Sequence, residues 1–225
     1  MRIAVVQHVV RSAPAQDLEA LVSAAVRAAA AGAQWVVLPA VPALDDGPLQ
    51  VELWRRLEAD VPGVDVTVAS GSDDVADSFE SVGPAGMMVL LVGDDCFAPD
   101  RLRAARAAAP GIAVLAPGVE SEIQGEATLE FVIALSTSLA SLVMLVETDG
   151  AEGGEPGHGG SAIVYLGEVV AEAESEDAII YADVETPIGP PEAPGPTPVV
   201  PSLLAQRVAT HSGRKLEVDY PADLD

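Results

Sequence analysis

The sequence is poor in cysteine, histidine and long apolar runs, and each shortage excludes a class of protein. A single cysteine in 225 residues rules out an intramolecular disulfide framework. That cysteine and three scattered histidines supply no recognisable zinc spacing, so we expect no metal and no cofactor. The uncharged stretch at residues 131–146 is shorter than the ~20 residues that span a bilayer, and it contains serine and threonine. A membrane-spanning protein is therefore not expected.

Basic side chains are also scarce: 11 stand against 35 acidic ones, which gives a formal net charge of −24. Such a surface repels phosphate backbones and anionic lipids, so we expect neither nucleic acid nor membrane as a partner. Two explanations of the acidity remain open, namely adaptation to a salty cytoplasm and an acidic, GC-rich proteome in which arginine replaces lysine. The N-terminus lacks an apolar run long enough for a signal peptide, and a cytoplasmic location is expected.

What the chain does have is a regular alternation of strand-like and helix-like segments. The helix-like segments have apolar residues at helical spacing and cover residues 13–31, 49–59, 99–109 and 120–141. Strand-like apolar runs cover residues 2–9, 35–38, 64–69, 87–92, 112–115, 142–146, 161–166 and 178–184. This alternation predicts an α/β protein whose strands are covered by helices. Seven prolines between residues 186 and 201 exclude helix and central strand there, so we expect one domain over 1–185 and a Pro-rich arm with a C-terminal tail over 186–225.

Several motifs occur in an order that resembles one enzyme superfamily. Residues 1–8 (MRIAVVQH), a helix-like stretch and residues 32–39 (GAQWVVLP) resemble the first strand, helix and second strand of the nitrilase (carbon-nitrogen hydrolase) superfamily. Later segments resemble its nucleophile elbow, its Asn-x-x-Gly turn, the following strand and the closing hairpin: 93–103 (GDDCFAPDRLR), 147–150 (ETDG), 158–164 (HGGSAIV) and 166–173 (LGEVVAEA). The resemblance covers residues 1–185, and it implies a four-layer α-β-β-α sandwich that usually forms a dimer.

The resemblance also implies where a Glu-Lys-Cys catalytic set should lie, and this sequence departs from all three positions. The family's Leu-Pro-Glu segment ends here in Ala40, whose methyl group cannot act as a general base. Counting back from Pro99 places the nucleophilic position at Gly93, and no lysine occurs between Glu52 and Gly93. We therefore interpret the chain as a catalytically inactive protein of this fold with a binding, regulatory or assembly role. A homodimer is expected, with a protein partner or small-molecule ligand.

Two other interpretations stay open at this point. Cys96 is the candidate for a replacement nucleophile in a divergent amidase or nitrilase. A following helix N-terminus lowers a thiol pKa, whereas the adjacent Asp94 and Asp95 raise it. His158, in a glycine-rich loop, is a candidate base or binding residue, and Asp94 and Asp95 form a candidate site for cations or amines. The remaining interpretation is a folded remnant that retains no ligand.

Overall fold

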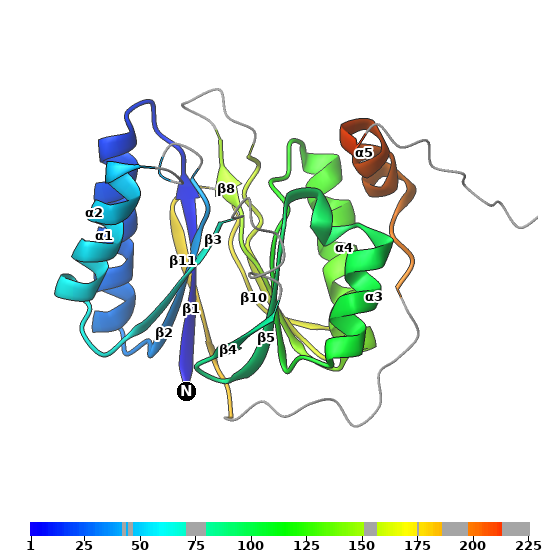
Figure 1. The fold of residues 1–225 in the computed structure, drawn as a ribbon, viewed down its shortest axis with the longest axis horizontal. Helices are drawn as coiled ribbons and strands as arrows, with labels where there is room; N and C mark the ends of the chain where they lie inside the picture. The colour runs from blue at the N-terminus through cyan, green and yellow to red at the C-terminus, as the bar shows by residue number, and fades with distance from the viewer. Residues whose placement is uncertain are drawn as a thin grey trace, which may run out of the picture.

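The structure is a computed structural model that describes residues 1–41, 44, 47–70, 80–150, 157–174, 176–185 and 198–212. Two β-sheets pack face to face, and helices cover both outer sides (Figure 1). The first sheet contains β11 (Ala178–Asp183), β1 (Arg2–Val9), β2 (Trp35–Pro39) and β3 (Asp65–Ala69) in that order, and β8 (Thr148–Asp149) pairs with β1. The second sheet contains β10 (Glu168–Glu172), β9 (Ala162–Tyr165), β7 (Leu142–Leu145), β6 (Ile112–Ala116), β5 (Gly86–Val92) and β4 (Glu80–Gly83).

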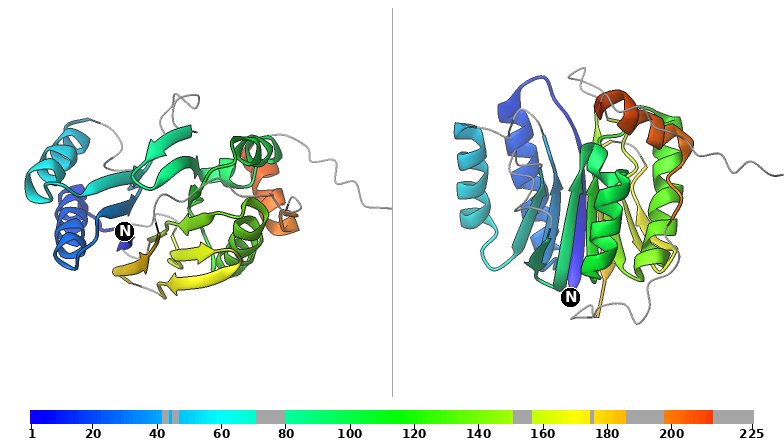
Figure 2. Two further views of the ribbon diagram at one scale, coloured as in Figure 1. Left: turned by 90° about the horizontal axis from the view of Figure 1, so that it is seen from below. Right: turned by 45° about the vertical axis from the view of Figure 1, so that its right-hand side comes forward.

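The helices divide between the two outer faces. The first sheet is covered by α1 (Pro14–Ala30) and α2 (Pro48–Asp60), and the second by α3 (Pro99–Ala108) and α4 (Glu122–Leu139) (Figure 2). Among the described helices, none is long and apolar enough to cross a bilayer. The four-layer α/β sandwich expected from the sequence is thereby confirmed.

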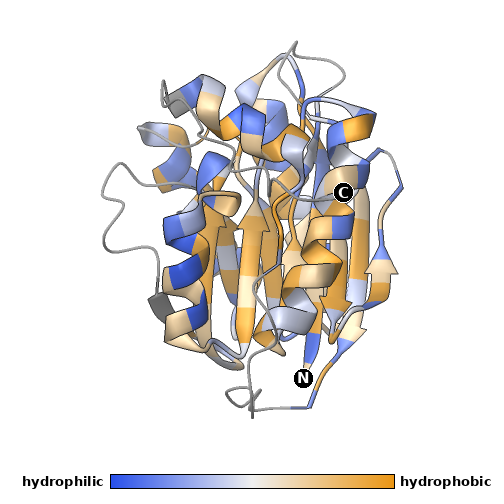
Figure 3. Ribbon diagram, turned by 90° about the vertical axis from the view of Figure 1, so that its right-hand side faces the viewer, coloured by the Kyte–Doolittle hydropathy of each residue, from blue (hydrophilic) through white to orange (hydrophobic). Residues whose placement is uncertain are grey.

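Strand alternation explains why the chain folds into four layers. Successive strand residues point to opposite faces of a sheet, so a strand buried on both faces must be apolar throughout. In β1, Ile3 and Val5 pack into a core between the two sheets, whereas Ala4 and Val6 pack into a core under α1 and α2. The strands of the second sheet divide in the same way between the central core and a core under α3 and α4. Figure 3 shows that these strands consist largely of apolar residues, as burial on both faces requires.

Two details differ from what the sequence indicates. The stretch 70–86, in which the sequence shows no strand-like or helix-like run, contains β4, which pairs antiparallel with β5. Val82 in β4 is 84% exposed, so this edge strand leaves little apolar signal in the sequence. Helix α4 buries Phe131, Leu135 and Leu139 in the core of its own chain, so these apolar groups are not available to a partner.

The second difference is a helix, α5 (Ser202–Ser212), in the segment expected as a tail. The fully buried Leu204 anchors α5 to the core under α3 and α4. Figure 1 shows α5 beyond the upper end of α4, at the end of the molecule opposite the N-terminus. This end holds the C-terminal ends of the parallel strands β5, β6 and β7, which is where α/β sheets commonly bind ligands.

Candidate functional site at the elbow

The candidate site is the connection between β5 and α3. It consists of the 3₁₀ turn η2 (Gly93–Cys96), which follows β5 directly and precedes the proline that begins α3. Gly93 has φ of 57°, a left-handed conformation that side chains other than glycine adopt at a cost. A Cβ atom placed there would meet nothing within 4 Å. The strand-turn-helix backbone of an elbow is therefore present, with space for a side chain, but glycine supplies no nucleophile.

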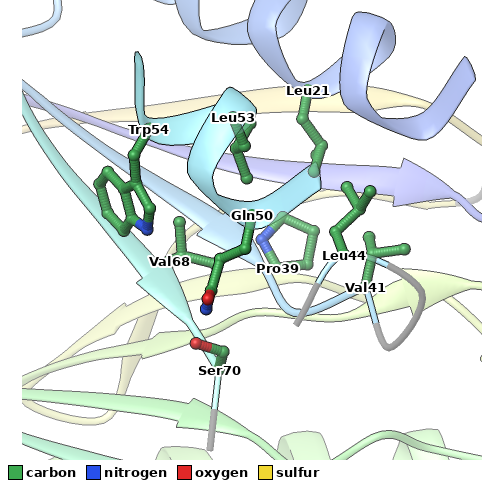
Figure 4. Close-up of a pocket in the computed structure, with 9 residues that line it drawn as sticks. All are labelled: Leu21, Pro39, Val41, Leu44, Gln50, Leu53, Trp54, Val68 and Ser70. Carbon is green, nitrogen blue, oxygen red and sulfur yellow. The ribbon is translucent and has the colours of Figure 1, made fainter. Parts of the chain in front are cut away.

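The matched position of the general base lies in the other sheet. Ala40 follows β2 directly, and its chain neighbours Pro39 and Val41 line a small hollow formed by the ends of β2 and β3 and by helices α1 and α2 (Figure 4). Its cavity volume of about 10 Å³ has room for roughly one water molecule. The described residues that line it are Leu21, Pro39, Val41, Leu44, Gln50, Leu53, Trp54, Val68 and Ser70. None of these described residues carries a charge.

Cys96 is enclosed by the protein interior. The side chain is 0% exposed, and its Sγ donates a hydrogen bond to the Leu91 carbonyl oxygen at 3.2 Å. Burial raises the pKa of the Cys96 thiol well above its usual range, and the neighbouring Glu147 carboxyl raises it further. Because the thiolate is the nucleophilic form, this environment suppresses reactivity.

Glu147 is a buried carboxyl group beside this thiol that the sequence analysis did not single out. It follows β7, and its Oε2 accepts a hydrogen bond from the Val119 backbone N–H at 3.1 Å. Its Oε1 is buried without a hydrogen-bond partner in the described part of the chain. Burial raises the pKa of Glu147 to about 8, although the Val119 N–H favours the ionised form. The side chain is therefore mostly a neutral carboxylic acid at pH 7.

The two elbow aspartates are already paired with basic side chains of the same chain. Asp94 accepts from Arg207 Nε at 3.1 Å through Oδ1 and faces His211 Nδ1 at 3.0 Å through Oδ2. Asp95 pairs with Arg101, with 3.2 Å between Oδ2 and Nε. The carboxylates that the sequence suggests for cations or amines thus have basic side chains as partners, and two of these, Arg207 and His211, come from α5.

His158 lies in a different segment of the fold from the elbow residues. It is exposed, and its backbone forms an isolated antiparallel bridge with Asp149 beside β1. Within the described ranges, no hydrogen bond or ion pair links its ring to Cys96 or Asp94. The structure therefore brings Cys96, Asp94 and Asp95 together in one turn, adds Glu147 and Arg207, and shows no contact between these groups and His158.

A second polar cluster lies on the outer side of the first sheet. The buried His8 has its Nε2 at 2.7 Å from Asp17 Oδ1 and its Nδ1 at 3.2 Å from Asp177 Oδ1. Arg11 closes the cluster through an ion pair with Asp177. A groove of about 230 Å³, lined in part by His8, Ser23, Arg27 and Asp177, runs beside it. Because both ring nitrogens face carboxylates, the imidazole has no free nitrogen to act as a base for a ligand in the groove.

Sequence reasoning missed Glu147 and Arg207 for identifiable reasons. Glu147 occupies the position of an asparagine in the matched turn, and only the fold shows that this position is buried beside Cys96. Arg207 follows a proline-rich segment and lies 113 residues from Asp94 in the chain. In the described part of the chain, no group of three or more metal-ligating side chains could hold a metal ion.

Comparisons with known proteins agree with the architecture. No family model matches the sequence, and the curated proteins contain no match. Among solved structures, a glutamate-to-glutamine variant of the amidase from Nesterenkonia sp. AN1, with acrylamide added at its active-site cysteine, has a TM-score of 0.66 at 20% identity, covering 84% of this chain and 95% of that chain.

Two further structures of that amidase, which is described as a member of the nitrilase superfamily, match to a similar extent. A cysteine-to-serine variant has a TM-score of 0.67 at 20% identity, covering 84% of this chain and 93% of that chain. A cysteine-to-alanine variant has a TM-score of 0.64 at 19% identity, covering 95% of this chain and 96% of that chain. The chain therefore has the fold of a nitrilase-superfamily amidase.

Proposed function

We propose that this chain is a divergent nitrilase-superfamily protein without carbon-nitrogen hydrolase activity, which serves a binding, regulatory or assembly role as a homodimer. The fold and the ordered motifs support the superfamily assignment. The matched positions of the general base and the nucleophile carry alanine and glycine, and the only lysine, Lys215, lies outside the described residues. Loss of these groups removes proton transfer and covalent catalysis together.

The environment of Cys96 is the observation that carries the proposal. It is the single cysteine of the chain, so any thiol nucleophile must be this one. Its side chain is fully buried, its thiol donates to a carbonyl, and burial and Glu147 both raise its pKa. Each feature favours the unreactive thiol.

One observation favours the rival function, a divergent amidase that uses Cys96. The Glu147 carboxyl lies close enough to influence this thiol, and a neutral carboxylic acid could donate a proton to a leaving group. However, a carboxyl that is neutral at pH 7 cannot take the proton from the thiol, and the fully buried Cys96 thiol is not exposed to solvent. The balance of these contacts favours the binding protein.

Ammonia release tests the proposal. Purified protein at tens of micromolar is incubated with acetamide, propionamide, acetonitrile and an N-carbamoyl amino acid, and Cys96→Ala protein is the matched control. We expect the two proteins to release ammonia at the same rate as buffer, since loss of a nucleophile costs about six powers of ten in rate in a well-studied hydrolase. Turnover by the unmodified protein that disappears in Cys96→Ala would establish the divergent amidase instead.

A further inference from the structure

The side chain of Arg207 is held by a set of groups that matches a guanidinium ion. Its Nε donates to Asp94 Oδ1 at 3.1 Å, its Nη1 to the Gly118 carbonyl oxygen at 2.9 Å, and its Nη2 to the Pro117 carbonyl oxygen at 2.6 Å. The guanidinium carbon lies 5.9 Å from the centre of the Phe97 ring. Only 9% of the Arg207 side chain is exposed. All three nitrogens are thus bound, and an aromatic ring lies within cation-π distance.

The groups that hold this guanidinium all belong to the sheet and its turns, and none belongs to α5. Asp94 lies in η2, and the two carbonyls lie in the turn that follows β6. Phe97 is fully buried and packs edge-to-face on Phe131 of α4, with ring centres 5.7 Å apart. The walls of the site are therefore fixed by the domain core, whereas α5 contributes only the occupant and the His211 contact to Asp94.

The geometry selects a guanidinium over an ammonium ion. A planar guanidinium presents its donors in a fixed fork, and here three acceptors receive them from one side-chain carboxylate and two successive carbonyls. An ammonium group is a compact point charge that holds its hydration more strongly, so it fits such a partly dry site less well. The acidic surface of the chain, with a formal net charge of −24, further favours a cationic ligand.

We propose that the elbow is a binding site for an alkylguanidinium group, occupied in this chain by Arg207 of its own C-terminal helix. The site accepts a free alkylguanidinium ligand when the Arg207 side chain is absent or withdrawn, and α5 then acts as a built-in competitor. This inference deepens the proposed binding role and rests on it for its biological meaning, because it names the ligand class of the same elbow.

The test is chemical rescue of Arg207→Ala by methylguanidinium chloride, followed by thermal unfolding. Loss of the buried guanidinium leaves Asp94 and two carbonyls without their donors, and we expect the midpoint to fall by about 4–8 °C. Methylguanidinium at about five times its dissociation constant should raise the unfolding midpoint of Arg207→Ala by about 2–4 °C relative to sodium chloride at the same concentration. Methylammonium chloride should restore less than half of that amount.

Three control proteins make the result specific. The unmodified protein should gain nothing, because Arg207 fills the site. Arg55→Ala, which removes an exposed arginine paired with Glu52, should gain nothing either. The double variant Asp94→Ala/Arg207→Ala should lose most of the rescue. Equal effects of methylguanidinium on all four proteins would overturn the proposal, as would equal rescue by methylammonium.

Should Arg207→Ala fail to fold, Arg207→Gln provides the second variant, because its amide can still donate to one carbonyl while the guanidinium position stays empty. Rescue of Arg207→Gln by methylguanidinium supports the site, and no rescue contradicts it. The ammonia-release assay is independent of these measurements. If methylguanidinium rescues the variant and the unmodified protein also releases ammonia, the proposed inactivity is refuted and the guanidinium site stands. If there is neither rescue nor ammonia release, only the guanidinium site is refuted.

Discussion

Glu147→Gln should stabilise the protein, and by an amount that grows with pH. Burial raises the pKa of Glu147 from 4.5 to about 8. Below pH 4.5 the group is protonated in both the folded and the unfolded chain, so it costs nothing. Between pH 4.5 and about 8 the unfolded chain loses the proton and the folded chain keeps it, so folding becomes less favourable by about 1.4 kcal/mol per pH unit. Above about pH 8 both states are ionised and the cost levels off.

Glutamine removes this titration while keeping the shape and an oxygen that can accept from the Val119 N–H. Between pH 5.5 and 7.5, the free-energy advantage of Glu147→Gln over the unmodified protein should therefore increase by about 3 kcal/mol. A pH-independent offset from the new amide group does not affect this slope. The titration of every other group cancels in the comparison.

Urea unfolding of both proteins at pH 5.5, 6.5, 7.5 and 8.5 measures this difference. The advantage should rise across the first three values and change little beyond pH 8. A difference that stays constant over the whole range would refute the reasoning, because it would mean that Glu147 titrates alike in the folded and unfolded chains.

Three further outcomes follow from the structure. Asp17→Ala should lower the free energy of unfolding, measured in urea, by about 3 kcal/mol, because His8 Nε2 and the Arg11 backbone N–H lose a buried acceptor. Substitution of the exposed Ser23 on the same helix by alanine should change this free energy by less than about 0.5 kcal/mol. The melting midpoint should rise between about 0.01 and 1 M potassium chloride as the screening length falls from ~30 to ~3 Å, and a flat or falling midpoint would show that the acidity is not destabilising. Sedimentation at micromolar concentration should reveal a dimer, and a monomer alone would contradict the proposed assembly.

Most of the architecture could be predicted from the sequence, because a strand that is buried on both faces has a continuous run of apolar residues. Continuous apolar runs such as Ile112–Ala116 are required where a strand faces a helix layer on one side and a second sheet on the other. The short edge strand β4 has no such apolar run, because an exposed position such as that of Val82 does not have to be apolar. Helix α5 was not predicted, because the segment before it is rich in proline. Its position depends on Leu204 and Arg207, whose contacts form only in the folded chain.

Part of the candidate site could likewise be predicted from the sequence, and part could not. The positions of Ala40 and Gly93 could be predicted, because each follows a strand whose end the motifs locate. The surroundings of Cys96 could not be predicted, because its burial and its neighbour Glu147 come from elements 51 residues apart in the chain. Sequence alone suggested an accessible acidic turn at Asp94, whereas the structure shows a carboxylate engaged by a distant arginine.

If Cys96 is not a nucleophile, acrylamide should not form an adduct with it in the native protein. Acrylamide is the compound found attached to the active-site cysteine in the similar amidase structure. We expect the intact mass of the native protein to stay unchanged over hours at pH 7.5, and a single adduct to form on Cys96 only after unfolding in urea. A stoichiometric adduct on native protein, formed faster than in urea, would contradict the account and identify Cys96 as an activated thiol.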